Sequence, residues 1–285
     1  MQTVFIAGAT GYLGRYLCAE YRSRGWQVVA LVRDAVRAAG LDADRLVEAE
    51  ATRPETLKGT MDGADLVISA LGITRQADGL GYHEVDYQAN INLLREAQHA
   101  TVQRFAYIHV LNAGKMQGVS LADEKAAFVS ALQAADIAST VIAPSGYFSD
   151  MADFLAMARS GRVWLFGAGT HRINPIDGGD LAAATADAIA EERDWLNVGG
   201  PETFTHSELA ALAFKAVGRP VKITRLPDSF RKAALRLLPW LTPRRIHGPA
   251  QFFLTALGID MVGEPRGTRR LGDHFADLVR FTARD

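Results

Sequence analysis

The chain has 285 residues, of which 48% are apolar and 22% charged, and its formal net charge is −1. This length suits one large α/β domain or a nucleotide-binding domain with a smaller second part. The near balance of 31 basic and 32 acidic side chains argues against a nucleic-acid-binding protein. The single cysteine, Cys18, excludes an intramolecular disulfide and a multi-cysteine metal site. We see no leader and no apolar run of bilayer length, so we expect a cytoplasmic protein.

The first 145 residues alternate short apolar runs with longer helical patterns, which indicates βαβ units around a parallel sheet. The runs are continuous rather than alternating, as is typical of strands buried on both faces. The fourth expected helix has Ser120 as its N-cap and Asp123 in its first turn. The expected helices cover residues 12–24, 54–60, 84–100 and 121–134, and the expected strands cover residues 4–7, 28–32, 46–48, 66–70, 104–108 and 139–143.

Beyond Pro144 the pattern changes, with a strand-like run at 163–166 and a helix that begins near Asp180 as its N-cap. From about residue 197 onward, prolines separate shorter helices. We therefore predict an α/β fold with a doubly wound parallel Rossmann sheet over residues 1–145, to which residues 171–192 return. Residues 146–285 are expected to form a smaller substrate-binding or partner-binding lobe that covers the strand ends.

The most specific motif is Gly8-Ala9-Thr10-Gly11-Tyr12-Leu13-Gly14, between the first strand and the next helix. A phosphate-binding turn needs glycine where the chain bends, where its backbone approaches a pyrophosphate, and where helix packs on strand. The helix that follows directs free N–H groups at the phosphates. We expect Gly8, Thr10, Gly11, Tyr12, Leu13 and Gly14 to hold the pyrophosphate. A structural glycine turn without a ligand is the alternative.

Arg33 follows the second strand, nineteen residues after Gly14. An acidic residue at this strand tip binds the ribose hydroxyls of NAD, whereas an arginine favours the additional phosphate of NADP. We therefore expect NADP(H) as the cofactor, with NAD(H) less favoured. A solvated surface arginine is the alternative.

The glycine loop, with its G-x-x-G-x-x-G spacing, resembles that of the extended and atypical branches of the short-chain dehydrogenase/reductase superfamily. Later segments are similar to that superfamily's fourth strand, its fifth strand, its proline-bearing turn beside the nicotinamide, and the segment that closes the substrate pocket. These are residues 65–72, 107–113, 142–150 and 174–182. The resemblance is greatest to the NmrA-like atypical group. This group contains NADP-sensing regulators, isoflavone and benzylic-ether reductases, and divinyl-chlorophyllide-type reductases. An accessory subunit of complex I that holds NADPH is a further relative. It implies that Ala70, Leu71 and Gly72 wall the cofactor ribose and that Pro144 and Gly146 lie near the carboxamide.

The chain departs from that superfamily at its catalytic pair. Typical members carry Tyr-x-x-x-Lys, in which the lysine lowers the tyrosine pKa so that the tyrosine can transfer a proton. None of the seven tyrosines here has a lysine four residues later. Lys125 lies on the expected helix, but Leu121 stands at the tyrosine position and Asn112 at the serine or threonine position. Alcohol–ketone interconversion by the usual mechanism is therefore in doubt.

Three residues remain as catalytic candidates, each with a structural alternative. Lys125 is expected to bind the nicotinamide ribose or to act as a base, unless it is a surface lysine paired with Asp123 or Glu124. His109 can supply a proton because histidine titrates near neutral pH, but it also suits a core position. Tyr147 is a second candidate acid or a packing residue. The scattered histidines indicate no metal site.

Residues 225–247 carry six basic residues against Asp228 alone. Phe230, Ala234, Leu237 and Leu238 recur at helical spacing until Pro239, which we expect to interrupt the helix. The usual interpretation is a helix with its apolar stripe on the core. Peripheral contact with a membrane or a protein complex is the alternative.

We predict an NADPH-dependent reductase acting on a small, apolar or conjugated acceptor held between the lobes. The alternative is a non-catalytic NADP(H)-binding redox sensor or a structural subunit, which the missing tyrosine favours. Epimerase or dehydratase chemistry with a recycled cofactor is a third hypothesis, and the missing Tyr-x-x-x-Lys pair counts against it.

Overall fold

The computed structural model describes residues 1–72 and 79–282. The chain divides into two compact units, residues 1–143 with 182–196 and residues 144–181 with 197–285. Each unit has its own apolar core, and each is described by itself.

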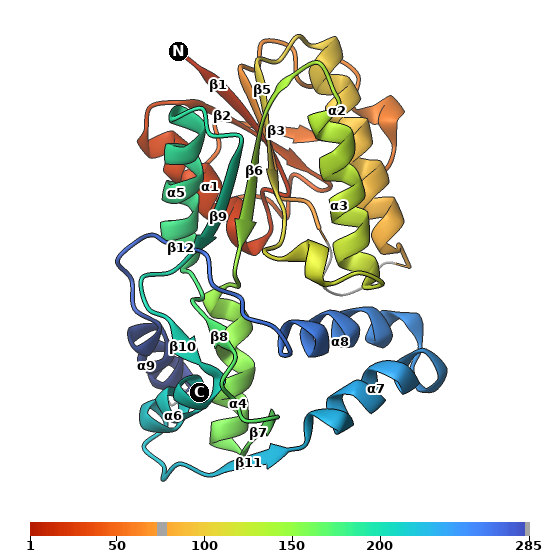
Figure 1. Ribbon diagram of the computed structural model, residues 1–285. Coiled ribbons are helices and arrows are strands. Elements are labelled where there is room, and N and C mark those ends of the chain that lie inside the picture. Colours follow the sequence, from red (N-terminus) through yellow and green to blue (C-terminus); the bar gives the residue numbers. More distant parts are fainter. Residues whose placement is uncertain (73–78, 283–285) are drawn as a thin grey trace. The chain divides into compact units, whose positions relative to one another are not determined.

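Most strands of a large parallel sheet belong to the first unit, and its edge strand β12 belongs to the second (Figure 1). Among the described residues the sheet has eight strands in the order β12-β9-β6-β5-β4-β1-β2-β3. Neighbouring strands from β3 to β6 run parallel, as do β9 and β12. This arrangement confirms the α/β Rossmann fold predicted from the sequence. The strands are β1 (Thr3–Ala7), β2 (Gln27–Val32), β3 (Arg45–Glu48), β4 (Leu66–Ser69), β5 (Arg104–Ile108), β6 (Ala138–Pro144), β9 (Trp195–Gly199) and β12 (Glu264–Pro265).

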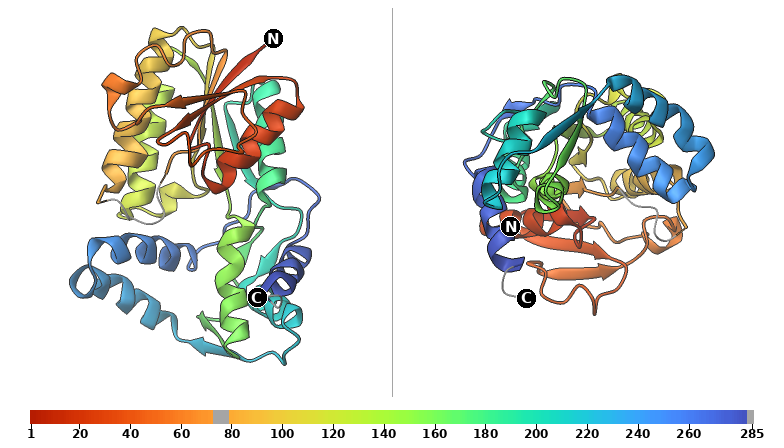
Figure 2. Two further views of the ribbon diagram at one scale, coloured as in Figure 1. Left: turned by 180° about the vertical axis from the view of Figure 1, so that it is seen from behind. Right: turned by 90° about the horizontal axis from the view of Figure 1, so that it is seen from below.

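Helices cover both faces of this sheet (Figures 1 and 2). One face carries α1 (Tyr12–Ser23) and α5 (Gly178–Ala190), and the other carries α2 (Ala89–His99) and α3 (Ser120–Gln133). On α1, Leu13, Leu17 and Tyr21 are buried at intervals of four, which places one apolar stripe on the sheet. Apolar side chains of β1, β4 and β5 form one core with those of α2 and α3.

Two of the expected helices differ in the structure. Of residues 54–60, a short 3₁₀ turn forms at Pro54–Thr56, and Gly59 adopts a φ of +71°, which ends any regular helix. The helix expected at 84–100 begins as a π-helical turn over His83–Gln88 and continues as α2. π-Helical turns are rare in proteins, and many of those known lie at functional sites.

Both predicted N-caps are wrong. Ser120 is the first residue of α3 rather than its cap, and the side chain of Asp123 instead accepts a hydrogen bond from the Gly118 amide at 3.1 Å. Helix α5 starts at Gly178, where the Asp177 carboxylate accepts bonds from the amides of Gly179 and Asp180. Asp180 does not cap the helix. Its carboxylate accepts hydrogen bonds from the amides of Thr268 and Arg269, each at 2.8 Å.

The second unit surrounds a core shared by α4 (Ala152–Arg159), α6 (His206–Ala216) and α9 (Leu271–Thr282). Two small sheets border it, a parallel pair and an antiparallel pair. These are β7 (Val163–Phe166) with β11 (Ile223–Leu226), and β8 (Arg172–Ile173) with β10 (Phe204–Thr205).

Helices α7 (Asp228–Leu241) and α8 (Arg244–Ala256) lie side by side in this unit (Figures 1 and 2). The expected interruption at Pro239 is wrong, since α7 continues to Leu241. The amide and hydroxyl of Thr242, three residues beyond the proline, both donate to the Leu238 carbonyl and close the last turn of the helix. In the described part of the chain, every helix is too short or too polar to cross a bilayer.

Candidate cofactor site

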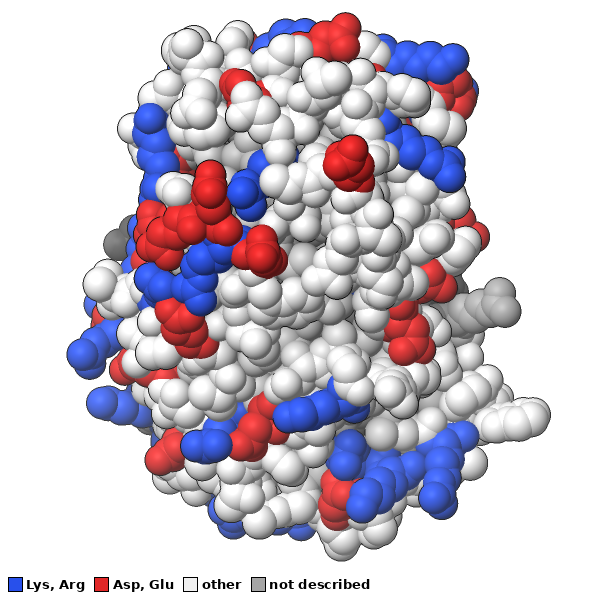
Figure 3. Space-filling view, turned by 45° about the horizontal axis from the view of Figure 1, so that its top comes forward, with Lys and Arg blue, Asp and Glu red and all other residues white. Residues whose placement is uncertain are grey.

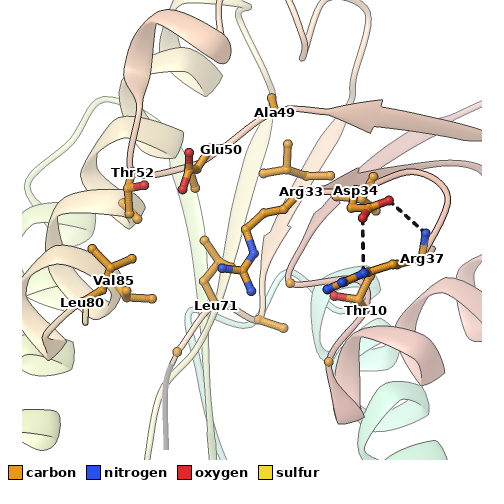
Figure 4. Close-up of a pocket in the computed structure, with 18 residues that line it drawn as sticks. Thr10, Arg33, Asp34, Arg37, Ala49, Glu50, Thr52, Leu71, Leu80 and Val85 are labelled. Atoms are coloured by element: carbon orange, nitrogen blue, oxygen red, sulfur yellow. Dashed lines mark hydrogen bonds and ion pairs between the residues drawn. The ribbon is translucent and has the colours of Figure 1, made fainter. Parts of the chain in front are cut away.

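A cavity of about 740 Å³ opens at the carboxyl ends of the central strands of the first unit (Figure 4). Ligands of open parallel sheets bind at this edge, where the strand order reverses between β1 and β4. Three segments form most of its wall: the glycine loop after β1, the Val32–Arg37 turn after β2, and residues 70–72 after β4.

The glycine loop has a geometry that other residues cannot adopt. Gly8 has a φ of +82°, and a Cβ there would lie 2.8 Å from the backbone of Ala70. A Cβ on Gly14 would overlap the carbonyl oxygen of Gly8, so this glycine lets α1 pack directly on β1. The Gly11 amide donates to the Gly8 carbonyl at 3.0 Å and closes the turn. The open backbone and the start of α1 beside it fit a dinucleotide pyrophosphate.

Two arginines border the cavity after β2. Arg33 extends into the cavity toward Leu71, and Arg37 lies beside Thr10 (Figure 4). Asp34 positions Arg37, because its carboxylate accepts the Arg37 amide at 3.0 Å and lies 3.4 Å from the guanidinium Nε. The turn thus presents two guanidinium groups, the chemistry that suits a phosphate dianion.

The predicted cofactor residues other than Lys125, which is described below, divide into three groups. Seven line the cavity: Gly8, Thr10, Gly11, Arg33, Ala70, Leu71 and Gly72. Leu13 and Gly14 are buried in the first turn of α1, so any contact they make with a pyrophosphate comes from their backbone. The Tyr12 ring packs 5.4 Å from the Tyr16 ring. Pro144 and Gly146 belong to the second unit, and their role stays a prediction.

The sequence analysis missed several residues of this wall. They are Leu31, Val32, Asp34, Arg37, Ala49, Glu50, Ala51, Thr52, Leu80, Val85 and Ala89. Residues 49–52 follow β3 directly, so the rule that ligands bind beyond the carboxyl ends of strands indicated them. Leu80 and Val85 carry no comparable signal.

Lys125 is buried beneath the cavity floor, with 8% of its surface exposed. Its Nζ lies 3.3 Å from Asp86 Oδ1, 3.2 Å from Tyr107 Oη and 3.1 Å from the Ile108 carbonyl oxygen. A Cβ on cavity-lining Gly72 would lie 3.0 Å from the same Nζ. The alternative of a surface lysine paired with Asp123 or Glu124 is therefore wrong. Four oxygen neighbours, with the Leu71 carbonyl at 3.5 Å, suit an ammonium group with three donors.

Tyr107 gives this lysine a tyrosine neighbour from another element. The ring packs 4.6 Å from Phe128 in the core, and burial together with the charge of Asp86 raises the pKa of its hydroxyl well above the usual value. A lysine beside the tyrosine does not offset that burial. Tyr107 therefore keeps its proton and contributes to positioning Lys125, whereas the superfamily's tyrosine exchanges its proton with a substrate.

His109 follows β5 and is also buried, with 6% of its surface exposed. Burial, and secondarily Lys125, lowers the pKa of its imidazole to about 3. It is therefore neutral near pH 7, which removes the expectation that it titrates there. Its Nδ1 has no hydrogen-bond partner among the described residues, and its ring packs edge-on against Trp195.

The third catalytic candidate, Tyr147, lies in the second unit. It precedes a 3₁₀ turn, and its amide donates to Asp150 Oδ2 at 3.1 Å. Its catalytic role stays a prediction. Cys18 is buried, which raises the pKa of its thiol to about 12, in keeping with a packed small side chain.

A sequence profile of the family described as NAD(P)H-binding matches residues 8–152, just over half of the chain. The chain belongs to this NAD(P)H-binding family, which confirms the family assignment and the nicotinamide-dinucleotide cofactor predicted from the sequence.

The chain is also similar to individual proteins. It is 26% identical to the photosystem II assembly factor Ycf39 of Synechocystis sp., over 83% of this chain and 75% of that protein. It is 25% identical to the divinyl chlorophyllide a 8-vinyl-reductase of Arabidopsis thaliana, over 79% and 60% respectively. The fold is shared with the NADPH complex of the Escherichia coli quinone oxidoreductase QOR2 (TM-score 0.77, 23% identity, 97% and 99% coverage). It is also shared with the Citrobacter sp. triphenylmethane reductase (TM-score 0.76, 20% identity, 98% and 99% coverage).

Proposed function

We propose that this chain is an NADPH-dependent reductase of a small, conjugated acceptor. The observation that carries the proposal is the glycine-walled cavity with Arg33 and Arg37 at its β2 end. When bound, the cofactor supplies a hydride to the acceptor. The chain's own residues bind and orient the dinucleotide, and the buried Lys125 donates a hydrogen bond to the carbonyl of cavity-lining Leu71.

NADP(H) is preferred over NAD(H) in this proposal because of charge. A 2′-phosphate placed at the β2 end of the cavity faces Arg33 and Arg37, whose guanidinium groups match a phosphate dianion. Asp34 is already engaged by Arg37 and so opposes such an anion less than a free carboxylate does.

A conjugated acceptor fits the acid–base groups of the first unit. Hydride transfer to an isolated carbonyl creates a localised alkoxide that requires a positioned acid. Tyr107 and His109 are poor acids near pH 7, for the reasons given above. A quinone, a cationic dye or a conjugated vinyl group spreads or neutralises the added charge and needs less help from an acid. The names of three of the similar proteins refer to such acceptors.

The second candidate is a protein that binds NADP(H) without turning it over. The burial of Lys125, Tyr107 and His109 favours it, because none of these groups is exposed to a reacting substrate in the first unit. A redox sensor or an assembly factor needs the cofactor site and no catalytic acid. The assembly-factor name of one relative agrees with this alternative.

Turnover distinguishes the two candidates. The purified chain is incubated with NADPH and, in turn, a benzoquinone, a triphenylmethane dye and an aliphatic ketone, while the NADPH absorbance is followed. A reductase consumes NADPH with one of the conjugated acceptors, prefers it to the ketone, and loses activity in Arg33→Asp at limiting NADPH. Tight NADPH binding in a calorimetric titration without consumption supports the binding protein instead, and absence of binding contradicts both.

A further inference from the structure

Helix α7 presents an apolar face that its own unit leaves exposed. Trp240 is 86% exposed, Leu241 74%, Phe230 59% and Leu237 52%. With 100° between successive residues, these four and the exposed Ala233 fall within about 120° of the helix circumference. Scattered exposed apolar residues are normal on proteins, but a continuous apolar stripe that includes a tryptophan indicates a contact surface.

A different side of α7 makes the contact with its own unit. Arg231 is buried, and its guanidinium donates to the Leu254 carbonyl of α8 at 3.1 Å and to Asp228. Ala234, Leu235 and Leu238 are half-buried on that same side. Of the stripe that the sequence predicted to face the core, Ala234 and Leu238 do so. Phe230 and Leu237 lie instead on the exposed face of α7.

The charge around the exposed stripe has one sign. Residues 219–241 contain six basic residues and one acidic residue, in a chain whose net charge is −1. The acidic residue, Asp228, is already engaged by Arg231 and by Lys232, and these cations lower its carboxyl pKa to about 2. Lys232 and Arg236 are exposed on the side of α7 turned away from α8. On the left side of the face in Figure 3, by contrast, acidic and basic side chains lie close together.

We propose that the exposed face of α7, with Phe230, Leu237, Trp240 and Leu241 flanked by Lys232 and Arg236, docks on an anionic lipid surface. A helix of this composition lies in the membrane interface with its aromatic and aliphatic side chains among the lipid chains and its cations at the headgroups. A second copy of the chain fits less well, because pairing of two α7 helices brings like charges together. The proposal is independent of turnover, since no residue of the cofactor cavity takes part.

The test is co-sedimentation of the full chain with large unilamellar vesicles. Vesicles of phosphatidylcholine alone are compared with vesicles that also contain phosphatidylglycerol. We expect binding that requires phosphatidylglycerol and weakens at high salt. Arg236→Gln reduces the partition coefficient about fivefold, the share of one cation near a charged surface. Trp240→Ser with Leu241→Ser reduces it about tenfold or more.

Phe281→Ser provides the matched control, because Phe281 is an apolar residue of α9 that is 68% exposed and lies outside the proposed face. Its partition coefficient stays that of the wild type. All variants change exposed side chains, and NADPH affinity together with the melting temperature verifies that they fold.

Two outcomes overturn the proposal. The first is equal or no binding to the two kinds of vesicle, and the second is wild-type binding by the Trp240/Leu241 variant. Where no vesicle binds and light scattering shows a dimer that this variant converts to a monomer, the face belongs to an interface with a second copy.

Discussion

At the scale of single residues, we expect Arg33 and Arg37, which line the cavity, to decide which dinucleotide it favours. Arg33→Asp places a carboxylate where the 2′-phosphate of NADPH is expected, so NADPH affinity falls by about a hundredfold or more and NADH affinity stays level or rises. Arg37→Gln removes one guanidinium and lowers NADPH affinity about tenfold. Calorimetric titrations with both dinucleotides measure these effects. An Arg33→Asp variant that retains the wild-type preference contradicts the assignment.

The buried His109 makes the stability of the fold depend on pH. In the unfolded chain its imidazole binds a proton below the ordinary pKa of 6.5, whereas in the folded protein it does so at about 3. The free energy of unfolding therefore falls as the pH drops below 6.5, by up to about 1.4 kcal/mol per pH unit. Between pH 6.5 and 5 this residue accounts for about 2 kcal/mol.

Urea unfolding at pH 7 and pH 5 measures this contribution. The free energy of unfolding falls less between pH 7 and pH 5 in His109→Gln than in the wild type. Any loss of stability that the substitution itself causes is present at both pH values and cancels in this comparison. His206, whose pKa burial lowers to about 4, gives a further loss of the same sign in both proteins. An equal pH dependence in wild type and variant shows that His109 is not held neutral by the fold.

At this scale the sequence predicted seven of the residues that line the cavity, but not the protonation or the contacts of the candidate catalytic residues. The spacing of Gly8, Gly11 and Gly14 follows from the local geometry of a turn, so the sequence contains it. The surroundings of Lys125 come from Asp86 and Tyr107, which lie 39 and 18 residues away along the chain. No local pattern indicates that these three side chains meet.

At the scale of elements, Gly14 sets the distance between α1 and β1. Gly14→Ala places a methyl group on the Gly8 carbonyl oxygen, and because both atoms belong to backbone, the helix itself must move. We expect a loss of about 3 kcal/mol or more and weak NADPH binding. Gly114→Ala is the control, since a Cβ there meets no described atom within 4 Å. Thermal melting with and without NADPH compares the two variants.

The pair of Asp86 and Lys125 links the π-helical turn before α2 to α3. Lys125→Met leaves the fully buried carboxylate of Asp86 without its cation, and we expect a loss of about 3–5 kcal/mol. Asp86→Asn with Lys125→Met removes both charges and restores part of that loss. Denaturant unfolding of the two single variants and the double variant gives the coupling energy. Additive effects contradict an ion pair that holds these elements together.

The elements themselves were predictable where their periodicity is strong and local. The strands β1, β2, β4 and β5 are continuous apolar runs, and they appear within one or two residues of their expected bounds. The capping of α5 by Asp177 depends on side-chain bonds that compete with the favoured cap pattern, such as the one that the Gly179 amide donates to Asp177 Oδ1. The π-helical turn at His83–Gln88 has no comparable sequence pattern. The two-residue strands β8 and β10 are too short to carry any periodicity.

At the scale of the whole molecule, the chain passes between the two units inside regular elements. The boundary between the units falls after Leu181, inside helix α5, and after Leu196, inside strand β9. Unfolding of one unit therefore breaks backbone hydrogen bonds of an element that continues into the other unit. We therefore expect one cooperative unfolding transition in spite of two separate cores. If NADPH binds in the proposed cavity, whose described lining residues all belong to the first unit, it then raises the stability of both units, by about 2.7 kcal/mol at a hundredfold excess over its dissociation constant.

Tryptophan fluorescence separates this outcome from independent unfolding. Trp26 and Trp195 report on the first unit and Trp164 and Trp240 on the second, so variants that retain one pair or the other follow each unit in turn. Equal midpoints with both pairs, and an equal shift on adding NADPH, indicate that α5 and β9 couple the units. A shift confined to the Trp26 and Trp195 pair means that the second unit unfolds on its own. In that case a redox signal read at the cofactor site would require a route other than shared stability to reach the face of α7.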